Sequence, residues 1–134
     1  MLLQFPGADA VDQPVVLFVV DEELQETCSL CAIALMGMGL IPVTARSPDE
    51  GFERACLIHP DVVVVNGTYQ DTRRFTRRLR DDVRTREAGL VVVGPGSEGD
   101  ADGYDRLLPQ SCPPEALAVD ILDVLTARRM RARG

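Results

Sequence analysis

The stretch PDVVVVN, residues 60–66, decides the fold of this 134-residue chain. Four consecutive valines between a proline-aspartate pair and an asparagine are typical of a β-strand that is buried on both faces. Similar apolar runs occur at residues 15–20 (VVLFVV) and 90–93 (LVVV). Strands of this kind belong to parallel sheets, whose two faces are covered by helices.

The segments between these runs have the features of helices. Residues 24–38 place apolar side chains three and four positions apart, which lines one face of a helix. Ser47, Pro48 and Glu50 form a typical helix start. The complete prediction alternates strands over 15–20, 40–45, 62–65, 90–93 and 106–108 with helices over 24–38, 48–59, 71–86 and from Pro114 onward.

This alternation predicts a single α/β domain. We expect a five-stranded, parallel, doubly wound sheet over residues 14–127, a length that suits one domain. Residues 1–13 are interpreted as an N-terminal extension, and residues 128–134 as a basic tail or the start of a linker. The extension and residues 130–134 are expected to be loose ends.

The charges exclude several function classes. Fourteen cations, all of them arginine, face 21 acids, for a net charge of −7. Because the chain has no lysine, Schiff-base chemistry and a P-loop lysine are excluded. The acidic balance argues against direct nucleic-acid binding. The sequence has no membrane-length apolar run and no basic signal-peptide start, so we expect a cytoplasmic protein with free thiols.

Polar residues and a glycine follow the predicted strands at the sheet edge where α/β proteins bind ligands. Asp21 and Glu22 follow the first strand, Asn66 ends the third and Gly94 follows the fourth. The two carboxylates could hold a hard cation such as magnesium, which prefers oxygen ligands. They could equally stabilise the start of the next helix, because carboxylates are favoured at that end of the helix dipole.

The chain resembles the receiver domain of bacterial two-component response regulators. The resemblance rests on VVLFVVDEE (15–23), GLIPVTARSPDEGFERACLIHPDVVVVNGT (39–68) and the late PPEAL (113–117), and it covers about residues 14–127. It implies the flavodoxin-like receiver fold. In that family an acidic pair holds magnesium, and an aspartate accepts a phosphoryl group from a histidine kinase. A Ser or Thr and a Lys then contact the phosphoryl oxygens.

The resemblance also implies that this chemistry is lost. Asp21 and Glu22 match the acidic pair, so weak magnesium binding is possible there. The phosphoacceptor position is Asn66, the hydroxyl position is Gly94 and the lysine position is Gln110. The short segment between the last two implies that the family's fourth helix is shortened or missing. We therefore predict an atypical receiver: a phosphorylation-independent protein-interaction module in signal transduction or transcriptional control, and not an enzyme.

Other interpretations stay open. The remnant pocket could bind a small ligand, which would make the domain a sensor. Asp61 or Asp71 could replace the phosphoacceptor, but we expect Asp61 at the opposite end of the sheet and Asp71 as a helix cap. Cys28 and Cys31 have the CxxC spacing of metal and redox sites, yet they fall in an apolar helix stripe, which favours core packing.

Two surfaces are candidates for binding partners. Leu30, Ile33 and Met36 lie on the outer side of the first predicted helix, which indicates an interface with a protein partner or a second copy, most simply a homodimer. The N-terminal segment could instead fold over them. The helix over 71–86 is rich in arginine, which is typical of a solvated face or of a docking surface for an acidic partner or nucleic acid. An effector domain could follow Gly134.

Overall fold

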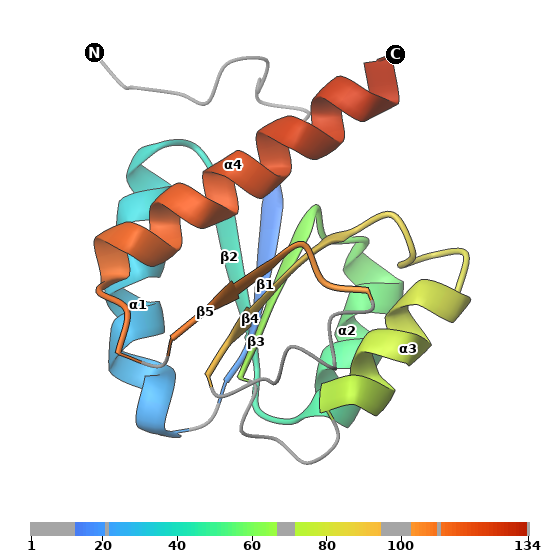
Figure 1. Ribbon diagram of the computed structural model, residues 1–134, viewed down its shortest axis with the longest axis horizontal. Helices are drawn as coiled ribbons and strands as arrows, with labels where there is room; N and C mark the ends of the chain where they lie inside the picture. Colours follow the sequence, from blue (N-terminus) through green and yellow to red (C-terminus); the bar gives the residue numbers. More distant parts are fainter. Residues whose placement is uncertain (1–12, 21, 67–71, 95–102, 110, 134) are drawn as a thin grey trace.

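The computed structural model describes residues 13–20, 22–66, 72–94, 103–109 and 111–133. These residues form a five-stranded parallel sheet with helices on both faces (Figure 1). The strands are β1 (Val15–Val19), β2 (Ile41–Ala45), β3 (Val62–Asn66), β4 (Gly89–Val93) and β5 (Arg106–Leu108), in the order β2-β1-β3-β4-β5. The helices are α1 (Glu22–Gly37), α2 (Pro48–Ile58), α3 (Thr72–Asp81) and α4 (Pro114–Arg133).

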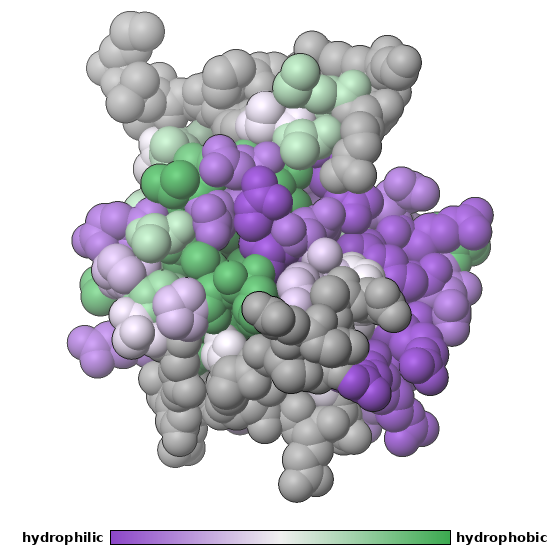
Figure 2. Space-filling view, in the orientation of Figure 1, coloured by the Kyte–Doolittle hydropathy of each residue, from purple (hydrophilic) through white to green (hydrophobic). Residues whose placement is uncertain are grey.

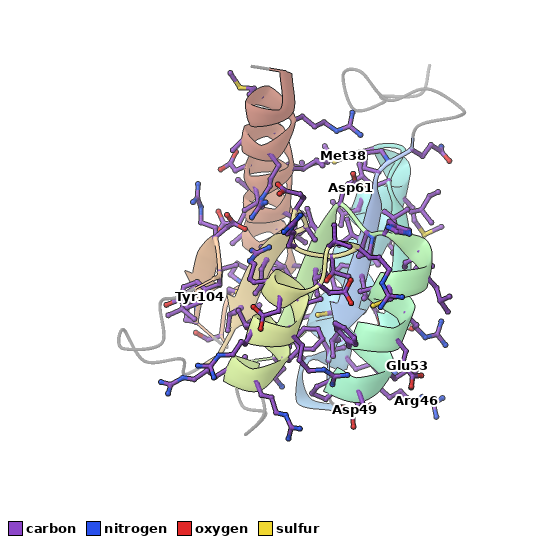
Figure 3. All side chains as sticks on the ribbon, turned by 90° about the vertical axis from the view of Figure 1, so that its right-hand side faces the viewer. Met38, Arg46, Asp49, Glu53, Asp61 and Tyr104 are labelled. Carbon is purple, nitrogen blue, oxygen red and sulfur yellow. The ribbon has the colours of Figure 1, made fainter. Side chains whose placement is uncertain are left out.

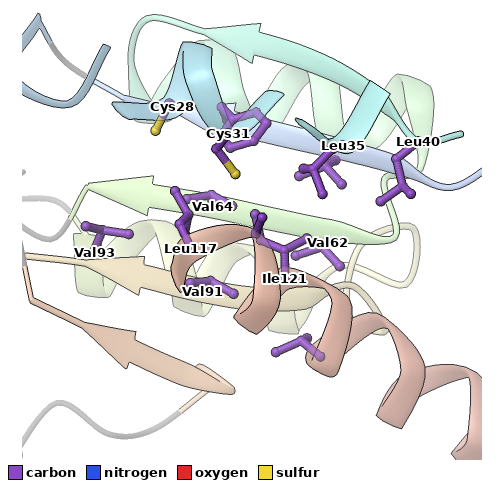
Figure 4. Packing of buried hydrophobic residues seen from close by; sticks show 14 of the residues in the cluster. Cys28, Cys31, Leu35, Leu40, Val62, Val64, Val91, Val93, Leu117 and Ile121 are labelled. Carbon is purple, nitrogen blue, oxygen red and sulfur yellow. The ribbon is translucent and has the colours of Figure 1, made fainter. Parts of the chain in front are cut away.

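The helices form two layers, which we call the α1/α4 layer and the α2/α3 layer. The core under the α1/α4 layer includes Phe18, Cys31, Leu35, Val64, Val91, Leu117 and Ile121 (Figure 4). The core under the α2/α3 layer includes Leu17, Val19, Ala55, Val65, Phe75, Leu79, Leu90 and Val92. The predicted doubly wound α/β fold is confirmed.

The valine run of β3 serves both cores. Val62 and Val64 face the α1/α4 layer, whereas Val63 and Val65 face the α2/α3 layer, because successive side chains of a strand point to opposite faces. All four are fully buried. Burying one valine stabilises the fold by about 1.5–3 kcal/mol, so a polar residue at any of these positions would be costly. This is why the run shows no alternation with polar residues.

The limits of β2 and α2 follow from local chemistry that the sequence shows. β2 lies at the edge of the sheet, where Pro42 is tolerated. Ser47 caps α2 and its hydroxyl accepts a hydrogen bond from the Glu50 amide at 3.2 Å. His59 ends the helix in the left-handed conformation, with φ at 51°, and its amide donates to the Ala55 carbonyl.

The prediction for α3 was too long. The helix ends at Asp81, not near residue 86, and Val83, one helical turn after Leu79 in the sequence, is 71% exposed. The Asp82 carboxylate accepts a hydrogen bond from the Arg84 amide at 2.8 Å, and the Thr85 hydroxyl donates to the Leu79 carbonyl at 2.7 Å. These side chains offer the backbone an alternative to another helical turn.

The prediction for the C-terminal end was too short. α4 continues to Arg133, although residues 130–134 were expected to be loose. Between β4 and β5 the described residues contain no helix, in agreement with the predicted shortening or loss of one helix. None of the described helices is long and apolar enough to cross a membrane.

Candidate functional site

Two of the predicted site residues meet at the carboxyl edge of the sheet. Asn66 is the last residue of β3, is fully buried, and pairs in register with Val93 of β4. Gly94 follows directly, and its amide donates to the Leu108 carbonyl at 2.8 Å. This bond continues the pairing of β4 with β5 past the end of β4. The structure therefore places Asn66 and Gly94, the predicted acceptor and hydroxyl positions, at the ends of neighbouring strands.

The backbone at Gly94 requires a glycine. Its φ is 128°, a conformation that residues with a Cβ atom rarely adopt. A serine or threonine here would be strained unless the end of β4 moved. The missing hydroxyl is thus a property of the local backbone as well as of the residue type.

Asn66 supplies an amide where an acceptor would need a carboxylate. The amide group is neutral, so it neither attacks a phosphorus atom usefully nor adds negative charge to a cation site. The Asn66 carbonyl accepts a hydrogen bond from the Thr72 hydroxyl at 3.0 Å, which joins the end of β3 to the first residue of α3. The position therefore contributes to the structure of this edge.

The remaining predicted site residues are not described. Asp21 and Gln110 lie outside the described residues, and Glu22 opens α1 without a described side chain. Within the described part of the chain, no group of three His, Cys, Asp or Glu side chains could hold a metal ion. A magnesium site at Asp21 and Glu22 stays a prediction.

The surrogate acceptors do not gain support. Asp61 lies at the amino edge of the sheet, opposite the carboxyl edge, as predicted (Figure 3). Its carboxylate accepts a hydrogen bond from the Val15 amide at 2.8 Å, and its own amide donates to the Val15 carbonyl at 2.9 Å. It joins the start of β3 to the start of β1. Asp71 lies outside the described residues.

A cluster that the sequence did not predict surrounds Asp105, just before β5. The Asp105 carboxylate is 3.1 Å from Arg128 of α4 and 3.5 Å from Arg80 of α3, and it accepts a hydrogen bond from the Leu90 amide at 2.8 Å. The three charged side chains, which we call the Asp105 cluster, are 18–22% exposed. Because Arg80 and Arg128 are 25 and 23 positions from Asp105 in the sequence, no local spacing reveals the cluster.

The two arginines of the Asp105 cluster also hold the α3–β4 connection. Arg80 donates to the carbonyls of Gly103, Arg86 and Ala88 at 2.6–2.8 Å. Arg128 donates to the Glu87 carbonyl at 2.7 Å. Guanidinium groups suit this role because they offer five donors in a fixed plane. Arg80 is therefore a structural residue, unlike the exposed arginines of the same helix.

The rest of the α3 surface is a solvated cationic face. Arg73, Arg74 and Arg77 are exposed. Arg78 lies over the Phe52 ring, 4.2 Å from its centroid, and forms a 2.9 Å ion pair with Asp49. Asp82, just past the end of α3, pairs with Arg84 at 2.8 Å.

The cysteines belong to the core. All four are free and buried, and Cys28 and Cys31 line the core under the α1/α4 layer (Figure 4). Burial, together with the nearby Cys112, raises the pKa of the Cys31 thiol to about 12. A thiol with so high a pKa is neither a good nucleophile nor a ready metal ligand. The preference for core packing over a CxxC site is confirmed.

The predicted interface residues are accessible. Leu30, Ile33 and Met36 of α1 are 50%, 65% and 60% exposed, respectively. The N-terminal segment that could cover them lies outside the described residues. Exposure of these side chains is confirmed, whereas their partner stays a prediction.

The chain is similar to solved receiver domains. No protein-family model and no curated protein matches it. Among solved structures it is similar to the signal receiver domain of a signal transduction histidine kinase from Syntrophus aciditrophicus, with a TM-score of 0.71, 16% identity, and coverage of 85% of this chain and 91% of that one.

Two further solved structures are similar to the chain to about the same degree. The chemotaxis response regulator CheY4 of Vibrio cholerae has a TM-score of 0.71 and 18% identity, covering 84% of this chain and 98% of its own. A CheY-like response regulator receiver domain protein from Methanospirillum hungatei JF-1 has a TM-score of 0.72 and 16% identity, with 89% and 98% covered. At such identities the likeness concerns the fold alone. The chain has the fold of response-regulator receiver domains.

Proposed function

We propose that this chain is an atypical receiver domain that works without aspartyl phosphate, as a protein-interaction module in signal transduction. The observation that carries the proposal is the carboxyl edge of the sheet. There, β3 ends in the buried amide of Asn66, and the next strand continues into Gly94 at a φ of 128°. The chain has the receiver fold, but this edge offers neither an acceptor carboxylate nor a hydroxyl at these two positions.

The composition of the whole chain supports the same conclusion. All 14 cations are arginine, so no lysine from any other position can take over the contact to a phosphoryl oxygen. A shifted acceptor is also disfavoured, because Asp61 lies at the amino edge and binds the Val15 amide. Acceptor, hydroxyl and lysine are thus absent together, which is a larger loss than one tolerated substitution.

Such a domain would be controlled by what it binds. With no phosphoryl group to switch it, its state would follow from partner binding or from its fixed geometry. Asp21, Glu22 and Asn66 would remain as remnants of the pocket, with weak magnesium binding at the two acids. We propose a role in cytoplasmic signalling or transcriptional control and no catalytic activity.

Phosphodonor labelling tests this proposal. The chain is incubated with acetyl phosphate and magnesium, and acid-labile phosphate is measured per chain beside a typical receiver domain as positive control. We expect no stoichiometric phosphate on the wild-type chain, because Asn66 carries no carboxylate. Stoichiometric phosphate would contradict the proposal, and loss of that label in Asp71→Asn would identify the surrogate.

A matched variant separates the causes. Asn66→Asp restores the carboxylate but leaves Gly94 and Gln110 unchanged. If the variant takes up phosphate, the amide alone blocks the chemistry; if it does not, the rest of the edge has also lost it. Thermal-shift measurements with metabolites test the alternative of a small-ligand sensor, which would require reproducible stabilisation by one compound.

A further inference from the structure

Helix α1 is apolar on two opposite sides. One side packs into the core through Leu24, Cys28, Cys31 and Leu35, which are at most 4% exposed. The other side presents Leu30, Ile33 and Met36, each at least half exposed. A helix with apolar residues all round is characteristic of an element covered on every side. The described part of the chain covers α1 on one side only.

The last charged residue of α1 whose side chain is described is Glu26, which is exposed one turn before Leu30. From Thr27 to Ala45 the sequence contains no charged residue, so the uncharged region extends from α1 into the edge strand β2. Figure 2 shows hydrophobic residues on the side of the molecule where α1 and α4 lie, whereas the side of α2 and α3 is mostly hydrophilic. We call Leu30, Ile33 and Met36 the α1 patch.

The helix surface beside the α1 patch permits close approach. Ala34 and Gly37 are exposed on α1, and a Cβ atom added to Gly37 would meet nothing within 4 Å. Small residues next to large apolar ones let a second helix settle at the short end of the usual 8–10 Å interaxial distance. An apolar patch with such a shape suits a helix better than a flat surface.

We propose that a second copy of this chain binds the α1 patch, so that two α1 helices pack against each other in a homodimer. In a two-fold symmetric dimer the same residues meet across the axis. An uncharged apolar surface is complementary to itself, because Ile33 can pack on Ile33 without an unpaired charge.

Charge argues against a dimer through the arginine face of α3. The chain carries a net charge of −7, so most pairings of two copies bring acids together. The arginine face of α3 would place Arg73, Arg74 and Arg77 against the same three residues. The α1 patch avoids both penalties. It is small beside a standard interface of roughly 1,600 Å² in total, so the dimer should be concentration-dependent.

Sedimentation of the full chain over a range of concentrations tests the proposal. We expect the wild type to approach the dimer mass as concentration rises. Ile33→Asp should hold the mass at that of the monomer at every concentration, because it places two carboxylates at the interface. Its far-ultraviolet circular dichroism and thermal midpoint should match those of the diluted wild type, since Ile33 makes no core contact that folding requires.

A matched control places the same change in the other layer. Val83 is 71% exposed in the α3–β4 connection, so Val83→Asp adds an equal charge far from the α1 patch and should leave dimerisation unchanged. Ile33→Ser, which adds no charge, provides a milder variant and should weaken the dimer. A wild type that stays monomeric, or a dimer that survives Ile33→Asp, would overturn the proposal.

The N-terminal segment is the competing occupant of the patch. Serine at Leu2, Leu3 and Phe5 in the full chain removes the apolar residues with which that segment could cover α1. We expect the dimer to persist in this variant. If the wild type is a monomer and only this variant dimerises, the segment covers the patch and the proposal is wrong. Phosphodonor labelling is independent of each of these results.

Discussion

Helices α1 and α3 cover opposite faces of one sheet and expose different chemistry. Helix α1 exposes large apolar residues such as Ile33 and Met36, whereas α3 exposes Arg73, Arg74 and Arg77. Beneath both layers the core is equally aliphatic, because the strands supply valine and leucine to each face. The difference teaches that the residues facing the sheet fix the fold, while the outer faces of the helices can differ in chemistry without changing it.

The two layers are also stabilised by different kinds of interaction. The α1/α4 layer packs by apolar contact and contains the buried thiol of Cys31. The α2/α3 layer relies on ionic and backbone hydrogen bonds around Arg80 and Asp82. The two layers meet at Asp105, which contacts an arginine from each. Three predictions test this contrast, and the first concerns the contacts of Asp105.

Removing the Asp105 carboxylate should have the largest effect. Asp105→Ala leaves Arg80 and Arg128 facing each other without a counter-charge and leaves the Leu90 amide without its acceptor. We expect a loss of about 2–4 kcal/mol in the free energy of unfolding, since breaking a mostly buried ion pair from one side is costly. Urea denaturation monitored by circular dichroism measures the loss.

Asp105→Asn is the matched control. The amide oxygen can still accept the Leu90 hydrogen bond, so this variant isolates the lost charge, and we expect it to cost less than Asp105→Ala. Equal stability of the wild type and Asp105→Ala would show that the layers do not depend on this connection. The two layers would then differ only in the chemistry of their exposed surfaces.

The second prediction concerns the α1/α4 layer at alkaline pH. Burial raises the pKa of Cys31 from 9.0 to about 12, so the native state holds this proton when the unfolded chain has already lost it. The free energy of unfolding should therefore fall between about pH 9 and 12. The chain has no lysine, so the other side chains that titrate there are the three remaining cysteines and the two tyrosines. Cys31→Ala should flatten this dependence in urea denaturation at several pH values.

Cys56 supplies the comparison from the α2/α3 layer. Its pKa is also raised by burial, but the neighbouring arginines Arg84 and Arg78 act in the opposite direction. Cys56→Ala should therefore change the alkaline slope less than Cys31→Ala. If Cys56→Ala has the larger effect, the assignment of alkaline sensitivity to the α1/α4 layer is wrong.

The third and smallest prediction concerns the α2/α3 layer in acid. Hydrogen bonds from Arg84 lower the pKa of Asp82 from 3.8 to about 2. The stabilisation is present above about pH 4 and is lost as the pH falls toward 2, because the unfolded chain binds the proton first. Asp82→Asn should reduce the acid-induced loss of stability. Asp81→Asn, the same change one residue earlier, is the control and should leave that loss closer to wild type.

Most of the fold could be predicted because its signals are local. The valine run of β3 has the pattern of a buried strand, and Ser47 with Glu50 marks the start of α2 within four residues. The end of α3 could not be predicted from periodicity. Val83 continues the helical spacing of Phe75 and Leu79, but the side chains of Asp82 and Thr85 bond to nearby backbone and end the helix first.

The candidate site likewise has some features that the sequence predicts and others that it does not. The positions of Asn66 and Gly94 at one edge follow from strand order, which parallel α/β topology makes predictable. The positive φ of Gly94 is a property of the backbone and has no signature beyond the glycine itself. The Asp105 cluster depends on tertiary distances between three separate segments, so the sequence offered no spacing by which to find it.

The contacts of Arg128 have a mechanical consequence. The 20-residue helix α4 is about 30 Å long and continues past the sheet in Figure 1, with Arg128 close to its C-terminal end. Arg128 holds that end against Asp105 and the Glu87 carbonyl, and Asp105 in turn holds Arg80. Bending or rotating the end of α4 would therefore pull on α3 from across the sheet. A single carboxylate, that of Asp105, thus couples the end of α4 to the helix that carries the arginine face.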